Sequence, residues 1–297
     1  MRAWASGRMM GKSGEERRHA VPQEARARYA AEVAALSGVS DPALLRALSL
    51  VRREDFLPPG PWLIEAADGS CYLSPDADPD RILHAVGVVL DPGRALHHAN
   101  PARVARMLER MEIRSGQTVL HVGAGPGYFT ALMAELVGPS GRIIAAEIDP
   151  VLAAAARAAL ADRANVRVEG DALALSLPRL DRIFVSCGLA ALPVSWLEAL
   201  AGDGRMMVPM TGSMDAGLQL QLEAVPDAAR LRATAVSCVM FYPCHGLRDD
   251  AAARAFDAAL AAGRVPDIRS LRRDPHAPEP ACWLHGDGWC LSCAAPE

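Results

Sequence analysis

The sequence of 297 residues lacks several features that mark common classes of protein. It has no excess of basic residues: 31 Lys and Arg are set against 35 Asp and Glu, so neither a nucleic acid nor a membrane surface is expected as a partner. No window approaches the ~18 apolar residues of a membrane helix, and no secretory signal is visible. Seven scattered cysteines are an odd number for a disulfide framework. We therefore expect reduced thiols and a cytoplasmic location.

The first hundred residues show no strand-helix alternation. Residues 1–21 are polar and aperiodic, which predicts a flexible tail. The stretch Gly7–Ser13 is not a phosphate-binding loop, because it has three residues between its glycines instead of four and no strand before them. Residues 22–100 predict a helical lead, with helices at 22–36 and 41–52 and a short strand at 84–90.

Strands and helices alternate regularly from residue 101. This pattern over residues 101–212 predicts an α/β fold, with a Rossmann-like, doubly wound and mostly parallel sheet of about seven strands. Residues 213–297 form a C-terminal extension. It begins with two β-rich runs that predict an antiparallel pair at the sheet edge, continues with a helix at 249–262 and ends in a cysteine-rich segment.

The most informative motif is VLHVGAGPGYFT, in which Gly123, Gly125 and Gly127 lie between a strand and a helix. Glycine backbone lets a cofactor approach the carboxyl end of the strand and the first N–H groups of the helix. The dinucleotide fingerprint G-x-G-x-x-G would need glycine at position 128, where this chain has Tyr128. A nicotinamide-dependent dehydrogenase is therefore disfavoured.

Two acidic residues follow the next strands. Glu147 ends the second strand, where a carboxylate can accept both hydroxyls of an adenosine ribose, and Asp171 ends the third, where an acid can accept from the adenine amino group. Each acid alone is also consistent with a solvated strand end. Together with the glycine loop they predict one crevice for an adenosyl cofactor.

This set of residues resembles the class I S-adenosylmethionine-dependent methyltransferases. The stretches Tyr29–Pro59 and Asn100–Ile143 resemble the lead and the core of the protein-L-isoaspartate O-methyltransferase family, over roughly residues 29–209. The resemblance implies S-adenosyl-L-methionine as the cofactor and a helical lead that covers the acceptor site. The candidate cofactor-binding residues are His121, Gly123, Ala124, Gly125, Gly127, Tyr128, Glu147, Ile148, Gly170, Asp171 and Ala172. Of these, His121 lies inside a core strand, which also favours a packed residue.

The segment ALHHANP departs from the family pattern. The family has Thr-Ile-Ser-x-Pro before its core helix, with hydroxyl groups at the methyl-acceptor site, and alignment on Pro101 places His97, His98 and Ala99 at the first three positions. We expect a turn in which the two histidines are candidate catalytic residues, as an imidazolium that binds a carboxylate or as a general base. A turn with a packed, hydrogen-bonded ring is the alternative. Loss of the family serine predicts that isoaspartyl repair is not supported.

Other residues are candidates for the acceptor site or for a metal. Ala99 and Asn100 before the core helix, and Ser186, Cys187 and Gly188 after the fourth strand, are the candidate substrate-binding residues. Cys187 is interpreted as a packed residue and not as a nucleophile. The C-terminal residues Cys282, His285, Cys290 and Cys293 are of zinc-ligand type in the pattern C-x2-H-x4-C-x2-C. The short middle spacing favours a final strand with reduced thiols, so no metal is expected.

Two functions remain open from the sequence. The first is an S-adenosylmethionine-dependent methyltransferase that transfers a methyl group in line to a carboxylate or other nucleophile of a peptide, protein or small molecule. The second is a catalytically altered S-adenosylmethionine-binding module with a regulatory or partner-binding role. The sequence leaves the acceptor and the oligomeric state open.

Overall fold

The computed structural model describes residues 21–94, 96–225, 230–244 and 249–296, so the Gly7–Ser13 stretch and the expected tail up to residue 20 lie outside the described part. Val21, the last residue of the expected tail, is buried. The chain divides into two compact units that do not follow its order. The first unit takes residues up to 113 together with 125–136 and 149–163, and the second takes 114–124, 137–148 and 164–297. Within the described residues, every helix is too short or too polar to cross a membrane.

The first unit contains five helices among its described residues. They are α2 (Gln23–Ser37), α3 (Pro42–Leu50), α4 (Pro101–Met111), α5 (Tyr128–Val137, whose last residue belongs to the second unit) and α6 (Pro150–Ala159). Three of them begin with an Asx cap followed by proline, because a side-chain oxygen of Asp41, Asn100 or Asp149 accepts a hydrogen bond from a backbone N–H two residues further on. The helix starts predicted at Asp41 and Asn100 are confirmed.

A small antiparallel sheet also belongs to the first unit. Its strands are β1 (Leu63–Glu65), β2 (Cys71–Leu73), β3 (Gly87–Asp91) and β4 (Leu96–His98), in the order β2-β1-β3-β4. Short 3-10 helices occur at η1 (Arg53–Phe56), η2 (Pro79–Ile82) and η3 (Pro92–Arg94). Residues 22–100 are thus not a purely helical lead, and the two histidines of ALHHANP lie on a strand instead of a turn. Strands of three residues are too short to show a period of two in the sequence.

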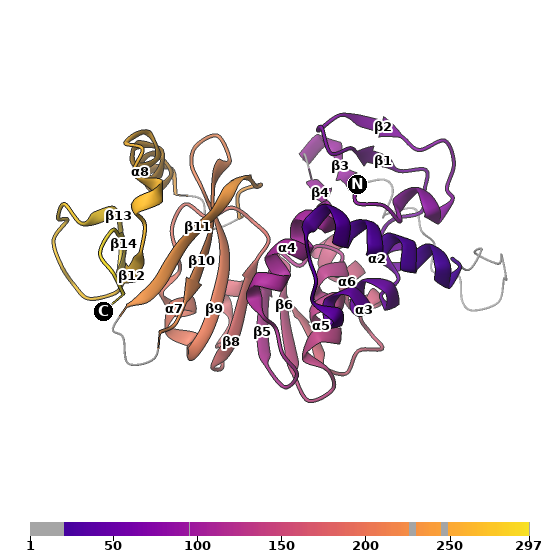
Figure 1. The fold of residues 1–297 in the computed structure, drawn as a ribbon, viewed down its shortest axis with the longest axis horizontal. Coiled ribbons are helices and arrows are strands. Elements are labelled where there is room, and N and C mark those ends of the chain that lie inside the picture. Colours follow the sequence, from indigo (N-terminus) through magenta and orange to yellow (C-terminus); the bar gives the residue numbers. More distant parts are fainter. Residues whose placement is uncertain (1–20, 95, 226–229, 245–248, 297) are drawn as a thin grey trace. The chain divides into compact units, whose positions relative to one another are not determined.

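The second unit is built on one long sheet, drawn from magenta to yellow in Figure 1. Its order is β13-β14-β12-β11-β10-β9-β8-β5-β6-β7. The strands are β5 (Thr118–Val122), β6 (Arg142–Ala146), β7 (Val166–Glu169), β8 (Leu180–Val185), β9 (Leu200–Thr211), β10 (Ala216–Glu223), β11 (Leu231–Met240), β12 (Ser270–Arg272), β13 (Cys282–Gly286) and β14 (Trp289–Ser292). Helices α7 (Val194–Ala199) and α8 (Asp250–Ala261) and the 3-10 helices η4 (Ala172–Ala174) and η5 (Val265–Asp267) complete it.

The sheet is parallel from β7 to β9 and antiparallel beyond, which confirms the predicted α/β class. The expected count of about seven strands is wrong, because ten described strands join the sheet. Strands β10 and β11 pair antiparallel as expected, but they do not form the edge, since β12 pairs with β11 and leads to the β13–β14 hairpin. The C-terminal segment therefore extends the sheet.

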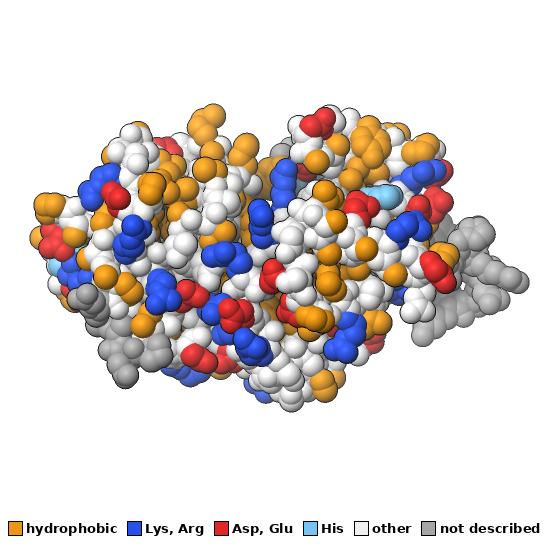
Figure 2. Space-filling model, in the orientation of Figure 1, with side chains coloured by type: hydrophobic (Ala, Val, Ile, Leu, Met, Phe, Trp, Pro, Cys, Tyr) orange, Lys and Arg blue, Asp and Glu red, His pale blue; other side chains and the backbone are white. Residues whose placement is uncertain are grey.

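Each unit has its own core of buried apolar side chains. In the second unit, Trp196 of α7 and Phe256 of α8 are fully buried in one cluster with alternate strand residues such as Leu220. In the first unit, Trp62, Ile64 and other apolar side chains close one face of the small sheet. Basic and acidic side chains are intermixed on the face drawn in Figure 2, in agreement with the balanced charge of the sequence.

Candidate functional site

The glycine-rich loop after β5 has a backbone that other residues would strain. Gly123, Gly125 and Gly127 have φ values of 73°, 57° and 100°, in the left-handed region that side chains rarely adopt. A Cβ at Gly123 would lie 3.3 Å from the carbonyl carbon of Ser186, and one at Gly127 would lie 2.8 Å from Leu160 Cδ1. A Cβ at Gly125 would meet nothing within 4 Å. Two of these glycines therefore permit close packing of the protein, and Gly125 leaves space for a ligand.

The two predicted acids lie at the same edge of the sheet as this loop. Within the second unit, β7, β6, β5 and β8 are neighbouring parallel strands, so their carboxyl ends meet at one edge. Glu147 directly follows β6 and is buried, with 7% of its surface exposed, and its backbone N–H donates to the Glu169 carbonyl at 3.2 Å. Asp171 follows β7, is exposed, and caps η4 by accepting from the Leu173 N–H at 2.9 Å.

The surroundings of these acids fit an adenosyl group. A Cβ at Gly170, like one at Gly125, would meet nothing within 4 Å. Ile148 is 44% exposed and Leu173 40% exposed, which is unusual for large apolar side chains so close to buried strands. The edge thus combines carboxylate acceptors, open space over glycine and exposed apolar surface, the set that a ribose and an adenine ring would use.

His121 is a packed residue of the core strand. It is fully buried, and burial lowers the pKa of its imidazole to about 3, so the ring is neutral. Its Nε2 lies 3.0 Å from Ser186 Oγ, the first residue after β8. His121 therefore contacts a candidate acceptor-site residue.

Tyr128 does not present its side chain to the loop's open space. Its ring is fully buried in the first unit, and its hydroxyl lies 2.9 Å from the hydroxyl of Tyr29 on α2. Burial raises the pKa of this phenol well above the usual value, so the hydroxyl stays protonated. The prediction of Tyr128 as a cofactor contact can apply only to its backbone, at the start of α5.

The segment after β8 is held by backbone hydrogen bonds. Gly188 N–H donates to the Tyr242 carbonyl at 2.7 Å, and Cys244 N–H donates to the Gly188 carbonyl at 2.8 Å. The pKa of the Cys187 thiol is raised well above its usual value, first by hydrogen bonding with Cys244 and then by burial. Cys187 is therefore a protonated thiol, which agrees with the interpretation that it is not a nucleophile.

The structure separates the roles of the two adjacent histidines. His98 is buried in the first unit, with its ring stacked on Phe129 at a centroid distance of 5.0 Å and tilted against Tyr128 at 5.5 Å. Its Nδ1 lies 3.3 Å from Nη2 of Arg53. Because a guanidinium only donates, Nδ1 must accept, which leaves the ring neutral with its proton on Nε2.

The expectation that His98 carries charge near neutral pH is therefore wrong. Burial first, and the charge of Arg53 second, hold the pKa of His98 well below its usual value. Arg53 itself is fully buried and donates to the carbonyls of Ile82, His84 and Val86. A buried cation gives no periodic signal, so the sequence did not identify Arg53.

His97 lies on the other face of β4 and is partly exposed. Its Nδ1 lies 2.7 Å from Oε2 of Glu65 on β1, and the two side chains are 23% and 28% exposed. Ala99 follows β4 and is half-buried, and Asn100 caps α4 while its amide donates to the Ala85 carbonyl. His97 thus stays a candidate, as a member of a His–Glu pair that the sequence did not reveal.

Comparison with known proteins identifies the family. A sequence model of protein-L-isoaspartate(D-aspartate) O-methyltransferase matches residues 88–248, more than half of the chain. The chain belongs to the protein-L-isoaspartate O-methyltransferase family. The match confirms the predicted family, and the methyltransferase names of the relatives agree with the predicted enzyme class and do not favour the alternative of a non-catalytic module. The resemblance of residues 29–87 lies outside this match.

Relatives and solved structures agree with this family. The chain is 34% identical over 184 residues to protein-L-isoaspartate O-methyltransferase 1 of Anaeromyxobacter sp. (strain Fw109-5), covering 59% of this chain and 76% of the relative. It is 38% identical over 161 residues to protein-L-isoaspartate O-methyltransferase of Aeropyrum pernix, covering 50% of this chain and 60% of that relative. The chain thus spans less than two thirds of the length of the Aeropyrum relative.

Two solved structures share the fold at low sequence identity. A protein-L-isoaspartate O-methyltransferase superposes with a TM-score of 0.58 at 21% identity, over 80% of this chain and 69% of that chain. A Plasmodium falciparum structure, named as a putative protein-L-isoaspartate O-methyltransferase in complex with S-adenosyl-L-homocysteine, superposes with a TM-score of 0.56 at 14% identity, over 75% and 98%. These likenesses confirm the class I methyltransferase fold.

Proposed function

We propose that this chain transfers the methyl group of S-adenosylmethionine to a carboxylate of a peptide or protein. Family membership supports the reaction class. The observation that carries the proposal is the placement of Gly123, Glu147 and Asp171 at one carboxyl edge of the sheet, beside open space at Gly170.

The residues at this edge would hold the cofactor by its adenosyl end. Glu147 would accept hydrogen bonds from the ribose hydroxyls, and Asp171 would accept from the adenine amino group. Ile148 would offer apolar surface to the adenine ring.

The chemistry demands little from the side chains of the chain. Bound S-adenosylmethionine supplies a methyl group already attached to a good leaving group. A carboxylate acceptor is ionised at neutral pH, so its oxygen forms the new C–O bond as the C–S bond breaks, and no general base is needed. Orientation of the two reactants alone can lower the barrier by about 7–11 kcal/mol. A neutral, buried His98 is therefore compatible with methyl transfer.

The acceptor is proposed to differ from an isoaspartyl residue. Ala99 stands where the resembled family has a serine, and a methyl group can neither donate nor accept a hydrogen bond. Close to it, His97 and Glu65 form a polar pair on the small sheet. We propose that this pair, together with Asn100, contacts the acceptor. Within the second unit, Ser186, Cys187 and Gly188 stay separate candidates for acceptor binding.

Methyl transfer is tested with labelled donor. The purified chain is incubated with S-adenosylmethionine carrying a labelled methyl group and with an isoaspartyl peptide, its aspartyl counterpart or a protein extract. A carboxyl methyl ester releases labelled methanol on mild alkaline treatment, whereas N-methyl groups do not. Base-labile labelling of a peptide or protein is expected. Labelling that resists base would refute transfer to a carboxylate.

Cofactor choice is tested separately by thermal unfolding. At one hundred times its dissociation constant a ligand adds about 2.7 kcal/mol to the free energy of unfolding, which corresponds to a rise in Tm of about 4 °C for a chain of this length. S-adenosylhomocysteine should produce this rise and NAD should not. A rise with NAD alone would contradict the assignment of the loop.

A further inference from the structure

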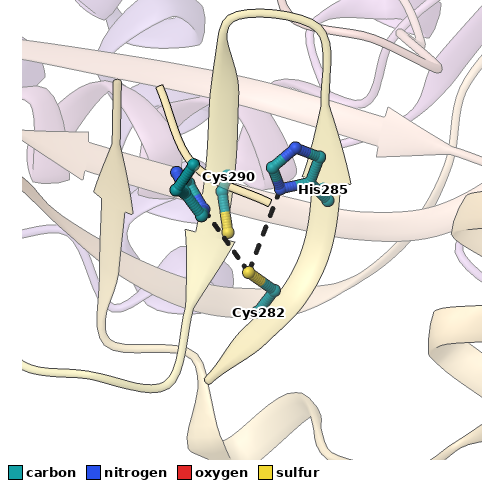
Figure 3. Close-up of side chains that lie close together, drawn as sticks. Cys282, His285 and Cys290 are labelled. Atoms are coloured by element: carbon teal, nitrogen blue, oxygen red, sulfur yellow. Dashed lines mark hydrogen bonds between the residues drawn. The ribbon is translucent and has the colours of Figure 1, made fainter. Parts of the chain in front are cut away.

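Four metal-ligating side chains converge in the C-terminal segment, outside the methyltransferase site. His276, Cys282, His285 and Cys290 each offer one ligand atom, and these atoms all lie within 4.8 Å of one another. Figure 3 shows the side chains of Cys282, His285 and Cys290 pointing toward one another from the two last strands. All four residues lie beyond residue 248, where the family match ends.

The β13–β14 hairpin brings three of the four together. His285 and Cys290 are direct partners in the antiparallel pairing. Cys282 and His285 are three residues apart, so in a regular strand they would point to opposite faces. The register shifts between Cys282 and Leu284, and this bulge inserts one extra residue, which turns both side chains to the same side.

The turn of this hairpin explains the short link between His285 and Cys290. Gly288 has a φ of 74°, and a Cβ at Gly286 would overlap the Trp289 ring, so both positions need glycine. The four intervening residues therefore close the hairpin instead of separating the ligands. The four-residue spacing between His285 and Cys290, which argued against a metal in the sequence, is the spacing of two paired residues in a tight β-hairpin.

The fourth residue of this cluster is His276, and not Cys293 as the sequence pattern suggested. His276 Nδ1 lies 2.7 Å from the Asp274 carbonyl oxygen, so Nδ1 donates its proton there and the lone pair of Nε2 faces Cys282 Sγ at 3.5 Å. A second hydrogen bond of this kind fixes the tautomer of metal-bound histidines in general. Cys293 Sγ lies 3.2 Å from Nη2 of Arg264 and is absent from the cluster.

The loop that carries His276 is anchored on both sides. Arg272 is buried at the end of β12, and its guanidinium bonds to Asp274 and Glu279, which flank His276 in the chain. The backbone N–H of Glu279 also lies 3.5 Å from Cys282 Sγ, in the position of a donor to a thiolate. These contacts hold the loop that carries His276 next to the hairpin.

Two of the distances between ligand atoms are close to those of a tetrahedral zinc site. Zinc binds sulfur at about 2.3 Å and nitrogen at about 2.0–2.1 Å, so tetrahedral geometry separates a sulfur from a nitrogen ligand by about 3.6 Å. Cys282 Sγ lies 3.5 Å from His276 Nε2 and 3.9 Å from His285 Nδ1. Two thiolates and two imidazoles are a ligand set that zinc prefers among divalent metals.

We propose that His276, Cys282, His285 and Cys290 bind one Zn²⁺ ion as a structural site. Four protein ligands complete a tetrahedron and leave no position for water or substrate, which is the arrangement of structural and not of catalytic zinc. The ion fixes the exposed loop 273–281 onto the β13–β14 hairpin and so completes the end of the long sheet. The site is independent of the methyl-transfer reaction.

The test measures bound zinc in the whole chain and in matched variants. The protein is produced with added zinc, purified anaerobically, dialysed against metal-free buffer and analysed for metal and protein content. One zinc per chain is expected in the wild type and in Cys293→Ser, and at least a fivefold loss in His276→Ala and Cys290→Ser. His285→Cys keeps four ligands, so it should retain zinc even if the alanine and serine variants fold poorly.

Cobalt provides a second readout. The wild type loaded with Co²⁺ should show the intense visible absorption of tetrahedral coordination and a thiolate charge-transfer band, and this band should grow in His285→Cys. Less than one fifth of a zinc per chain would overturn the proposal, as would a Cys282–Cys290 disulfide in the anaerobic protein. Loss of zinc in Cys293→Ser with full retention in His276→Ala would overturn the proposed ligand set.

Discussion

Replacement of His98 by phenylalanine should remove a defined part of the acid sensitivity of the protein. His98 is neutral in the folded state because burial, and then the charge of Arg53, lower its pKa well below the usual 6.5. In the unfolded chain the same imidazole titrates near 6.5. Below that pH the unfolded state binds a proton that the folded state cannot, so the stabilising contribution is complete above pH 6.5 and is lost as the pH falls.

The largest possible magnitude follows from the unfolded pKa, for a ring that stays neutral in the folded state over the pH range measured. Between pH 7.5 and pH 5.5 such a histidine costs about 1.4 kcal/mol of unfolding free energy. His98→Phe keeps the stacking on Phe129 and removes the titration. At neutral pH the variant loses an acceptor for Arg53, a cost of about 1 kcal/mol, since Nη2 still donates to the Val86 carbonyl at 2.8 Å.

Urea unfolding followed by circular dichroism at the two pH values measures this difference. The wild type should lose about 1.4 kcal/mol more than His98→Phe between pH 7.5 and 5.5. Ile64→Val, a buried change in the same unit with no ionisable group, should lose as much as the wild type on acidification. Equal losses in wild type and His98→Phe would refute the buried, neutral histidine and restore the imidazolium hypothesis.

Three further outcomes follow from the site. Glu147→Ala should weaken binding of S-adenosylhomocysteine by about 10- to 150-fold in calorimetry, the equivalent of one charge-assisted hydrogen bond of about 1.5–3 kcal/mol, and Glu169→Ala on the neighbouring strand should not. Ala99→Ser should raise methyl transfer to an isoaspartyl peptide over the wild-type rate, and efficient wild-type transfer would show that the serine is dispensable. His97→Gln and Glu65→Gln should each raise KM for the true acceptor with little change in the affinity for S-adenosylhomocysteine, and unchanged KM in both would remove the pair from the acceptor site.

The cofactor half of the site was accessible from the sequence because it depends on backbone features. Glycines with positive φ at 123, 125 and 127 and acids at the ends of successive parallel strands follow from local spacing and from the rule that such strand ends share one edge. The alternation of strands and helices then fixes the fold class. The family match agrees with the predicted fold class and family, whereas the cofactor roles of the single residues stay predictions.

The acceptor half was less accessible because it depends on long-range contacts, and the proposed zinc cluster because it depends on a local irregularity of β13. Arg53 and His98 are 45 residues apart, and neither sequence segment shows that the buried Arg53 guanidinium keeps the His98 imidazole neutral. His276 was missed because the C-x-x-C spacing draws attention to Cys293. The bulge in β13 and the loop bonded to Arg272 place the His276 imidazole beside Cys282, His285 and Cys290, and neither feature can be read from the sequence.

The placement of His98 changes how the departure from the family pattern is understood. Of the three residues that replace Thr-Ile-Ser, His98 occupies the position of the apolar isoleucine, and like an apolar residue it is buried, stacked and uncharged. Residues alternate sides along β4, so His97 lies on the side opposite His98, at the first former hydroxyl position, and Ala99 follows the strand at the second. In the proposed acceptor site the change is therefore one polar imidazole paired with Glu65 and one methyl group. A change in acceptor requires no more than this, because the carboxylate brings its own nucleophile and the cofactor residues are retained.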